Sequence, residues 1–382
     1  MDRHRHVRRV CYISGTRADF GLMARTLLLA QQSGKLEVSV CVTGMHLSPV
    51  FGNTVNEIVT SSLRICGKVP VELDGTTGVV MAKALGHELI GIADVLAREH
   101  PDIVVVLGDR GEMLAGALAA IHLNIPIVHV HGGERSGTVD EPVRHAISKL
   151  AHYHLVTTEG ARERLVHMGE KPEHVFVTGA PGLDGLQELP VRSRDDLCRQ
   201  WRFDPDRPVA LVVFHAVLQE QSEAGAQMDS IVHAVLSERV QALCLMPNAD
   251  AGGSLIRQAL ESHAQHPDVR SVTHLAREDY ISWMRVADVM VGNSSSGIIE
   301  AASLRLPVVN VGSRQSGRER SGNVVDVPSV KADIAAAVRK ALHGPRGPWP
   351  NVYGDGHAGE RIVALLASLP LSPELMYKSN AY

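Results

Sequence analysis

Residues 101–134 read PDIVVVLGDRGEMLAGALAAIHLNIPIVHVHGGE, and this stretch decides the fold class. It contains two β-branched runs, 102–107 and 127–131, with a helical segment between them. Both runs are nearly continuous in apolar residues, which is typical of strands in a parallel sheet that helices cover on both faces. The stretch therefore predicts a βαβ unit of an α/β protein.

The same alternation continues in both directions along the chain. Further β-branched runs of the first half cover 9–14, 36–43, 154–158 and 174–178. The pattern restarts near residue 200, with runs at 209–215, 241–246, 272–275, 289–291, 308–311 and 324–327. Between the two series, residues 180–206 carry turn signals and charged residues, as expected of a domain boundary. The sequence thus predicts two doubly wound domains with a ligand cleft between them.

The composition agrees with two globular domains and argues against several classes of partner. A chain of 382 residues with 45% hydrophobic and 21% charged residues can bury two cores. A net charge of -4, scattered basic residues and 4% aromatic residues predict no nucleic-acid partner. The apolar stretch 113–130 is interrupted by histidine, asparagine and proline, which predicts no membrane partner. No signal-peptide cleavage pattern follows the basic start, so we expect a cytoplasmic protein.

The loops that follow the predicted strands are where a ligand should bind. They read GTRADFG, TGMH, GDRGE, HGGE, FHA, MPNAD and GNSSSG. In the last of them, Ser294 and Ser295 precede a predicted helix and form an anion site that suits a diphosphate. Glu300, near the first turn of that helix, can accept hydrogen bonds from two vicinal hydroxyls, as in ribose. The alternative is a capping serine cluster with a glutamate that satisfies the helix dipole.

Three arginines recur at these strand ends. Arg17, Arg110 and Arg314 each follow a predicted strand, and together they indicate a polyanionic small ligand. A single arginine at a loop start is more often just solvated.

Two carboxylates are candidates for proton transfer. Asp109 ends an apolar strand, so we expect its carboxylate to be partly desolvated, unless it only caps the next helix. Asp140 and Arg144 are four residues apart on a predicted helix, so that the arginine can orient the carboxylate. The alternative there is an ordinary helix ion pair of little energetic weight.

The twenty histidines leave a choice between chemistry, metal binding and structure. His129 and His131 share one face of a predicted strand, as do His152 and His154, and such a pair can be half of a metal site. The chain has no HExxH and its five cysteines form no CxxC, so we expect neither a metal nor another cofactor. His215 ends the first strand of the second half and is expected to point into the predicted cleft, to serve a phosphate or a proton; the alternative is that it only caps the strand.

The chain resembles the hydrolysing UDP-N-acetylglucosamine 2-epimerases of sialic acid biosynthesis from about residue 9 to residue 327. The similarity is carried by GTRADFG, VTGMHLSPVFGNT, LGDR, HVHGGERSGTVDEPVRHAISKLAHYH, PNADAG and VGNSSSGIIEAASLRLPVVNVGSRQSGRE. The resemblance implies a GT-B type fold, with two Rossmann-like domains and a sugar nucleotide in the cleft. It also implies the metal-free reaction of UDP-N-acetylglucosamine with water to give N-acetylmannosamine and UDP.

The resemblance also implies which residues form the site. The uridine diphosphate is expected at Arg17, Gly21, Arg110, His215, Asn248, Leu275, Ser294, Ser295, Glu300 and Arg314. The sugar and its phosphate are expected at Asp19 and Arg144, and His46 is expected to face the ligand. The family's catalytic carboxylates match Asp109 and Asp140.

This chain departs from the family pattern at two positions. Where these enzymes often read HIEGGE, it has His131 and keeps only the second acid, Glu134. Ala216 stands where a proline usually follows His215. Because a histidine can move protons near neutral pH, we expect His131 and His215 to share the catalysis with the two carboxylates, and Glu134 to contact the substrate.

We expect an N-terminal domain of residues 1–183, a C-terminal nucleotide-binding domain of residues 184–362, and a final segment, 363–382, that packs back on the first domain. The expected function is that of a hydrolysing UDP-N-acetylglucosamine 2-epimerase, working as a dimer or tetramer. His131 keeps open a hydrolysing 2-epimerase of UDP- or GDP-linked 2,4-diacetamido-2,4,6-trideoxyglucose, on a route to legionaminic acid-like sugars. Further alternatives are a non-hydrolysing epimerase and a sugar-nucleotide sensor without catalysis.

Overall fold

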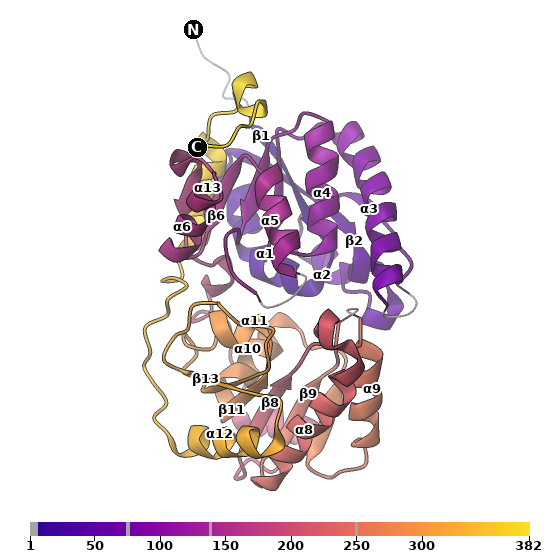
Figure 1. Ribbon diagram of the computed structural model, residues 1–382, viewed down its shortest axis with the longest axis vertical. Coiled ribbons are helices and arrows are strands. Elements are labelled where there is room, and N and C mark those ends of the chain that lie inside the picture. Colours follow the sequence, from indigo (N-terminus) through magenta and orange to yellow (C-terminus); the bar gives the residue numbers. More distant parts are fainter. Residues whose placement is uncertain (1–6, 74–76, 137–139, 249–250) are drawn as a thin grey trace.

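Two parallel sheets, one in each half of the chain, form the framework of the molecule (Figure 1). The computed structural model describes residues 7–73, 77–136, 140–248 and 251–382. The first sheet has the strand order β3-β2-β1-β4-β5-β6-β7, and the second has the order β10-β9-β8-β11-β12-β13. Every strand pair is parallel. The predicted α/β class with two doubly wound domains is therefore confirmed.

The first domain alternates strands and helices in the predicted order. Its strands are β1 (Arg8–Ser14), β2 (Leu36–Thr43), β3 (Arg64–Val69), β4 (Ile103–Leu107), β5 (Ile127–Val130), β6 (Tyr153–Val156) and β7 (Val175–Val177). Its helices are α1 (Arg17–Gln32), α2 (Val55–Thr60), α3 (Gly78–Glu99), α4 (Gly111–His122), α5 (Asp140–Leu150) and α6 (Glu159–His167). Only β3 was not predicted, because this edge strand, RICGKV, carries the polar Arg64 and Lys68 in place of an apolar run.

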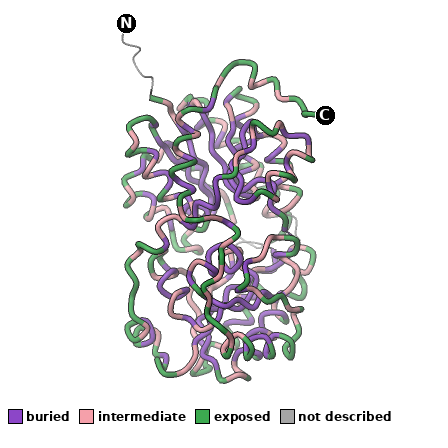
Figure 2. Tube along the Cα trace, turned by 90° about the vertical axis from the view of Figure 1, so that its left-hand side faces the viewer, coloured by how far each residue is buried: buried purple, intermediate pink, exposed green. Residues whose placement is uncertain are grey.

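The second domain repeats the arrangement, although the strand predicted at 272–275 lies three residues earlier, because this edge strand, VRSV, includes the polar Arg270 and Ser271. Its strands are β8 (Val209–Val213), β9 (Gln241–Leu245), β10 (Val269–Val272), β11 (Val289–Gly292), β12 (Val308–Val311) and β13 (Val324–Val327). Its helices are α7 (Arg194–Trp201), α8 (Ala224–Ser237), α9 (Gly253–Ser262), α10 (Arg277–Val286), α11 (Ser295–Ile299) and α12 (Lys331–His343). Helix α13 (Ala358–Ser368) follows. Figure 2 shows the buried residues gathered in the centre of each domain, where the central strands lie.

The strand order places the ligand-binding loops. In each sheet the chain reverses its direction of progress between the first strand and the strand beside it, β1 and β4 in one sheet and β8 and β11 in the other. Loops diverge at such switch points and leave a crevice at the carboxyl ends of the strands. The loops 15–16 and 108–110 leave one switch point, and the loops 214–217 and 293–294 leave the other. Both crevices belong to the space between the domains.

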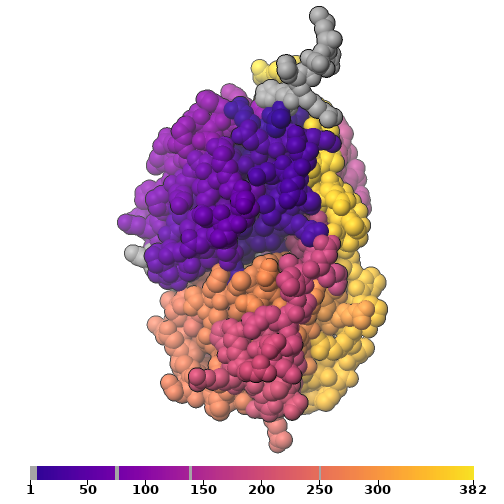
Figure 3. Space-filling model, turned by 180° about the vertical axis from the view of Figure 1, so that it is seen from behind, coloured from indigo at the N-terminus to yellow at the C-terminus, as the bar shows by residue number. Residues whose placement is uncertain are grey.

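The end of the chain returns to the first domain. Figure 3 shows the C-terminal segment running along the side of both domains. Helix α13 packs on α1, and Ile362 and Leu366 lie in the same core as Met23 and Leu27. The Asp184 carboxylate accepts hydrogen bonds from the first two backbone amides of α13, at 2.9 and 2.5 Å. The predicted boundary after residue 362 falls inside this helix, and we propose instead that the returning segment starts at Ala358.

Among the residues that the structure describes, no helix is long and apolar enough to cross a membrane.

The docking of α13 can be tested through its buried face. Replacing Ile362, which is fully buried, with alanine removes core volume shared with α1. We expect Ile362→Ala to lower the free energy of unfolding by about 2–5 kcal/mol, measured by urea denaturation. The control Glu360→Ala changes an exposed residue of the same helix and should stay within about 0.5 kcal/mol of the wild type. Equal loss in the two variants would contradict the packing described for α13.

Candidate active site

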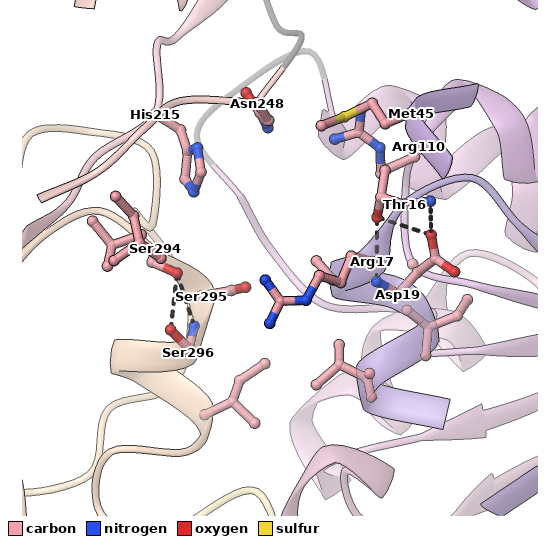
Figure 4. Close-up of a pocket in the computed structure, with 18 of the residues that line it drawn as sticks. Thr16, Arg17, Asp19, Met45, Arg110, His215, Asn248, Ser294, Ser295 and Ser296 are labelled. Atoms are coloured by element: carbon pink, nitrogen blue, oxygen red, sulfur yellow. Dashed lines mark hydrogen bonds between the residues drawn. The ribbon is translucent and has the colours of Figure 1, made fainter. Parts of the chain in front are cut away.

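A cavity of about 340 Å³ lies between the two domains. Its wall includes every predicted site residue except His46 and Leu275. Figure 4 shows the two sides of this cavity, with Thr16, Arg17, Asp19, Met45 and Arg110 on one side and His215, Asn248 and Ser294–Ser296 on the other. The tertiary structure therefore brings together residues that lie almost 300 positions apart in the sequence.

The turn between β1 and α1 is organised by Asp19. Thr16 caps α1, and the Asp19 carboxylate accepts hydrogen bonds from the Thr16 backbone N–H at 2.6 Å and the Ser14 hydroxyl at 2.6 Å. Further bonds come from the Gly15 N–H at 3.1 Å and the Tyr12 hydroxyl at 3.1 Å. Burial raises the pKa of Asp19, against the lowering effect of His46 and of the hydrogen bonds from Ser14 and Thr16. Although Asp19 reaches the cavity wall, its oxygens are already used to hold the turn.

Arg17 extends from this turn across the cavity. In Figure 4 its guanidinium points from the first domain toward Ser295 in the second. Its Nη1 lies 2.9 Å from Nδ1 of His274, and its Nε lies 3.1 Å from a carboxylate oxygen of Glu57. The same oxygen lies 3.1 Å from Nε2 of His274. Because His274 follows β10 while Glu57 is on α2, this group of three joins the two domains at the cavity.

Asp109 is paired with a buried arginine, and this pairing differs from the prediction. Arg144 on α5 is only 1% exposed, and its guanidinium donates to the Asp109 carboxylate, to the Glu134 carbonyl at 2.9 Å and to the Ser136 hydroxyl at 3.4 Å. The predicted partner, Asp140, instead has its carboxylate 3.9 Å from the Arg314 guanidinium of the second domain. Arg144 lies on the buried face of α5, whereas Asp140 begins the helix at the cavity rim, so the spacing of four residues does not bring them together.

His131 lies beyond the end of its strand. Strand β5 ends at Val130, and His131 has a left-handed backbone with φ +64°. Its Nδ1 lies 3.0 Å from the Glu134 carboxylate, which also accepts a hydrogen bond from Thr157 at 3.0 Å and lies 3.1 Å from the Arg318 guanidinium. Burial alone would raise the pKa of Glu134, but Arg318 and His131 hold it at about 2. Glu134 is therefore a carboxylate that stays ionised although it is fully buried.

The serine loop, Ser294–Ser296, opens a helix as predicted, but the helix is short. Helix α11 covers Ser295–Ile299, with Ser294 as its N-cap, so that Glu300, expected near its first turn, is its C-cap. Glu300 is 2% exposed and forms an ion pair with Arg277 of α10. Ser296 hydrogen-bonds the Tyr280 hydroxyl at 2.5 Å, and burial raises the pKa of Tyr280 to about 12. The Tyr280 hydroxyl therefore stays neutral at the cavity wall.

His215 is held at the end of β8 by its backbone. Its N–H donates to the Asn293 side chain at 2.8 Å, and the Asn293 amide donates back to the His215 carbonyl at 2.8 Å. Gly292, the residue before Asn293, has φ +137°. A Cβ at this position would lie 2.1 Å from the Val213 carbonyl oxygen, so only glycine fits. These contacts fix the point from which the His215 ring reaches the cavity.

The other paired histidines serve the fold. His129 hydrogen-bonds the Gly108 carbonyl at 2.7 Å and Ser148 at 3.0 Å, and burial lowers its pKa to about 3. His152 accepts the Ile127 N–H at 3.1 Å, and His154 lies 3.0 Å from Glu170. Within the described parts of the chain, no group of three or more potential ligands is arranged to hold a metal.

Two predicted residues lie outside the cavity wall. His46 is fully buried, with its Nε2 2.9 Å from the Ser14 hydroxyl and its Nδ1 2.8 Å from the Thr54 hydroxyl. Leu275 is 4% exposed and packs in the core of the second domain. Both support loops whose neighbours face the cavity.

Several wall residues were not predicted. Those with charged or titratable side chains are Glu57, His274, Arg277, Tyr280 and Arg318. Of these, His274 and Arg318 come from loops that follow β10 and β12. The rule that ligands bind at the loops after parallel strands, here called the strand-end rule, selected Arg314 and could also have found them. The helical residues Glu57, Arg277 and Tyr280 carry no such signal.

The chain is similar in sequence and in fold to known sugar-nucleotide epimerases. Residues 29–367 match the family described as UDP-N-acetylglucosamine 2-epimerase. A Legionella pneumophila protein, "UDP-N,N'-diacetylbacillosamine 2-epimerase (hydrolyzing)", is 52% identical over 98% of this chain and 100% of its own length. A Neisseria meningitidis serogroup B protein, "UDP-N-acetylglucosamine 2-epimerase", is 32% identical over 88% of each chain. The solved S. aureus MnaA-UDP complex has a TM-score of 0.79 at 23% identity, over 94% of this chain and 96% of its own, which shows a shared fold.

The structural role of His46 can be separated from ligand contact. Its replacement by leucine leaves the buried Thr54 hydroxyl without its ring partner, whereas the Ser14 hydroxyl keeps its bond to Asp19. We therefore expect His46→Leu to lower the free energy of unfolding by about 1–3 kcal/mol. Urea denaturation measures this loss. Met45→Leu, at the cavity wall beside it, is the matched control and should cost less than about 1.5 kcal/mol. A His46→Leu protein as stable as the wild type would refute the role described.

Proposed function

Because the chain belongs to the UDP-N-acetylglucosamine 2-epimerase family and is a hydrolysing sugar-nucleotide 2-epimerase, we propose that it acts on UDP-linked 2,4-diacetamido-2,4,6-trideoxyglucose, or UDP-N,N′-diacetylbacillosamine. The observation that carries this choice is the 52% identity to the Legionella pneumophila enzyme named for that substrate, against 32% to the Neisseria meningitidis enzyme named for UDP-N-acetylglucosamine. The proposed sugar is therefore the alternative that His131 left open and not the one first expected.

The cavity wall supports a sugar with a methyl group at C6. Leu22, Met45 and Phe51, all from the first domain, contribute apolar side chains to the wall. A 6-deoxy sugar presents a methyl group to such a surface, whereas the hydroxymethyl group of N-acetylglucosamine needs a hydrogen-bond partner when it is buried.

Cationic and hydroxyl groups support the binding of a diphosphate. Arg17, Arg110 and Arg314 line the cavity together with the serine loop at Ser294 and Ser295. Guanidinium groups form charge-assisted, bidentate contacts with phosphate oxygens. As the bond between C1 and the diphosphate breaks, negative charge grows on the leaving oxygen, and these groups stabilise it.

Acid and base groups around the cavity support exchange of the proton at C2. Asp109, His131 and Asp140 line the wall on the first domain, and His215 lines it on the second. In the proposed reaction a base removes the C2 proton while the nucleotide diphosphate leaves C1, which gives a C1=C2 double bond. Water then adds at C1, and a proton is delivered to the opposite face of C2. The products are UDP and the free 2,4-diacetamido-2,4,6-trideoxymannose.

The choice of sugar is tested by product NMR. The purified protein is incubated with UDP-N,N′-diacetylbacillosamine and, separately, with UDP-N-acetylglucosamine at equal concentration. We expect free UDP and the manno sugar to form with at least about tenfold higher kcat/KM from the first substrate, a difference of about 1.4 kcal/mol in transition-state binding. Faster hydrolysis of UDP-N-acetylglucosamine would refute the proposed sugar while leaving the reaction class intact. An intact UDP-linked manno sugar as the lasting product would indicate a non-hydrolysing enzyme.

The proton chemistry is tested by running the reaction in deuterated water with the wild type and with a variant of Asp109, the carboxylate paired with Arg144. The wild-type product should carry deuterium at C2, because the removed proton exchanges with solvent. Asp109→Asn keeps the shape of the side chain but removes its charge, and we expect kcat/KM to fall by about 10²- to 10⁴-fold. Asp94→Asn, on the exposed face of α3, is the control and should behave like the wild type. A product without deuterium, or an active Asp109→Asn variant, would contradict the mechanism.

A further inference from the structure

The contacts around His131 bring two ionisable side chains, His131 and Glu134, together at the cavity wall. The chain leaves β5 at Val130 and turns through the left-handed backbone of His131 and Gly133, with φ of +64° and +72°. At Gly133 a Cβ would lie 2.3 Å from the Ala161 carbonyl oxygen, so this tight turn depends on glycine. The turn brings the side chain of Glu134 back beside that of His131, three residues earlier.

Glu134 determines which nitrogen of His131 carries a proton. The carboxylate is fully buried and lies 3.0 Å from Nδ1 of His131. An ionised carboxylate only accepts hydrogen bonds, so Nδ1 must be the protonated nitrogen of the neutral ring. In the described parts of the chain, Nε2 of His131 is buried and has no hydrogen-bond partner. Because His131 lines the cavity, Nε2 is the nitrogen left to exchange a proton with a bound ligand.

The second domain reaches the same carboxylate. Arg318, in the loop after β12, places its guanidinium 3.1 Å from the other oxygen of Glu134. Its Nε donates to the Arg135 carbonyl at 3.0 Å, which fixes the loop against the turn. Thr157 donates to the oxygen that faces His131, at 3.0 Å. The charge on Glu134 is thus shared between a histidine of one domain and an arginine of the other.

We propose that His131 and Glu134 form a catalytic dyad, in which Glu134 is a positioning residue that sets the tautomer of His131. Arg318 of the second domain, on the other oxygen of Glu134, weakens the attraction between this carboxylate and the protonated His131 ring. This proposal rests on the proposed function, because it needs a sugar nucleotide in the cavity. In the elimination step, Nε2 takes the C2 proton, the C–H electron pair becomes the C1=C2 double bond, and the C1–O pair leaves with the diphosphate. The imidazolium then gives its proton to solvent. In the hydration step a carboxyl group of the cavity gives its proton to C2, water adds at C1, and the proton that this water loses returns to the carboxylate.

Other charged groups surround the dyad and enter its pH dependence. They are Asp109 and Arg110 after β4, His129 on β5, Asp140 and Arg144 on α5, His154 on β6, Arg164 on α6, Arg314 and Glu319 beside Arg318, and Tyr353 before α13. All of them stay in place in the variants used below, so the comparison between variants isolates the two partners of the dyad.

The test is the pH profile of kcat/KM in two variants that change opposite charges. Glu134→Gln removes the anion that favours the imidazolium, so the acid limb of the profile should move to lower pH by about 1–3 units, and the plateau should fall by about 10²-fold or more. Arg318→Gln removes the competing cation, so its acid limb should move to higher pH. If the two residues served folding alone, both variants would lower the rate, but their acid limbs would not move in opposite directions.

The surface ion pair of α6 provides matched controls. Glu159→Gln and Arg162→Gln make the same two changes of charge in a pair whose side chains are 62% and 34% exposed, and neither should move the acid limb. Glu134→Asp keeps the charge and should return the limb toward the wild-type position. Limbs that stay fixed in Glu134→Gln and Arg318→Gln, or that move in the same direction, overturn the proposal.

Two measures separate this proposal from the choice of sugar. The profiles are recorded with whichever of the two UDP-sugars the wild type hydrolyses faster, so that a wrong sugar leaves the test intact. Without any substrate, ¹³C-labelled histidine NMR follows the titration of His131, whose resonance is assigned by its loss in His131→Gln. Its midpoint should move to lower pH in Glu134→Gln and to higher pH in Arg318→Gln. An unchanged midpoint in both variants rejects the dyad even if turnover is never observed.

Discussion

The buried guanidinium of Arg144 is the interaction on which the arrangement of the site depends. Burying an unpaired cation in a protein interior costs several kcal/mol of desolvation free energy, so the folded state requires hydrogen-bond partners around the guanidinium. Those partners are the Asp109 carboxylate, the Glu134 carbonyl and the Ser136 hydroxyl. Through them, one side chain on α5 ties the loop after β4 to the turn after β5. The positions of Asp109 and His131 relative to each other follow from this single charge.

The second constraint is that polar side chains of the two domains contact each other across the cavity. Arg17 contacts His274, Glu134 contacts Arg318, and Asp140 lies near Arg314. Each pair joins a residue of the first domain to one from a loop of the second domain. A ligand that separated the domains would break these contacts, whereas a diphosphate between them can bind Arg17 and Arg314 while Arg318 stays paired with Glu134. Arg17 and Arg314 can therefore both link the domains and bind the leaving group.

Much of the fold and of the cavity wall could be predicted from the amino-acid sequence. The runs of β-branched residues identified the strands of both sheets except the edge strands β3, which was missed, and β10, which was placed at 272–275 instead of Val269–Val272; both edge strands carry polar residues. The strand-end rule selected most of the cavity wall. It could not separate residues that face the ligand from residues that hold the loops: Asp19 and His46 lie in such loops, but their polar atoms are bonded within the fold. Local spacing also misled, since Arg144 pairs with Asp109 instead of Asp140.

By itself, the sequence determined the α/β class, the two domains, the family and the reaction class, because these depend on patterns that are continuous along the chain. Only the tertiary structure decided which charges meet. The pairs Asp109 with Arg144 and Glu134 with Arg318 join residues 35 and 184 positions apart. No local periodicity encodes such contacts, since they arise where parallel strands end at a common edge and two domains close over it. His131 shows the division: its identity is written in the sequence, but its partner and its available nitrogen come from the fold.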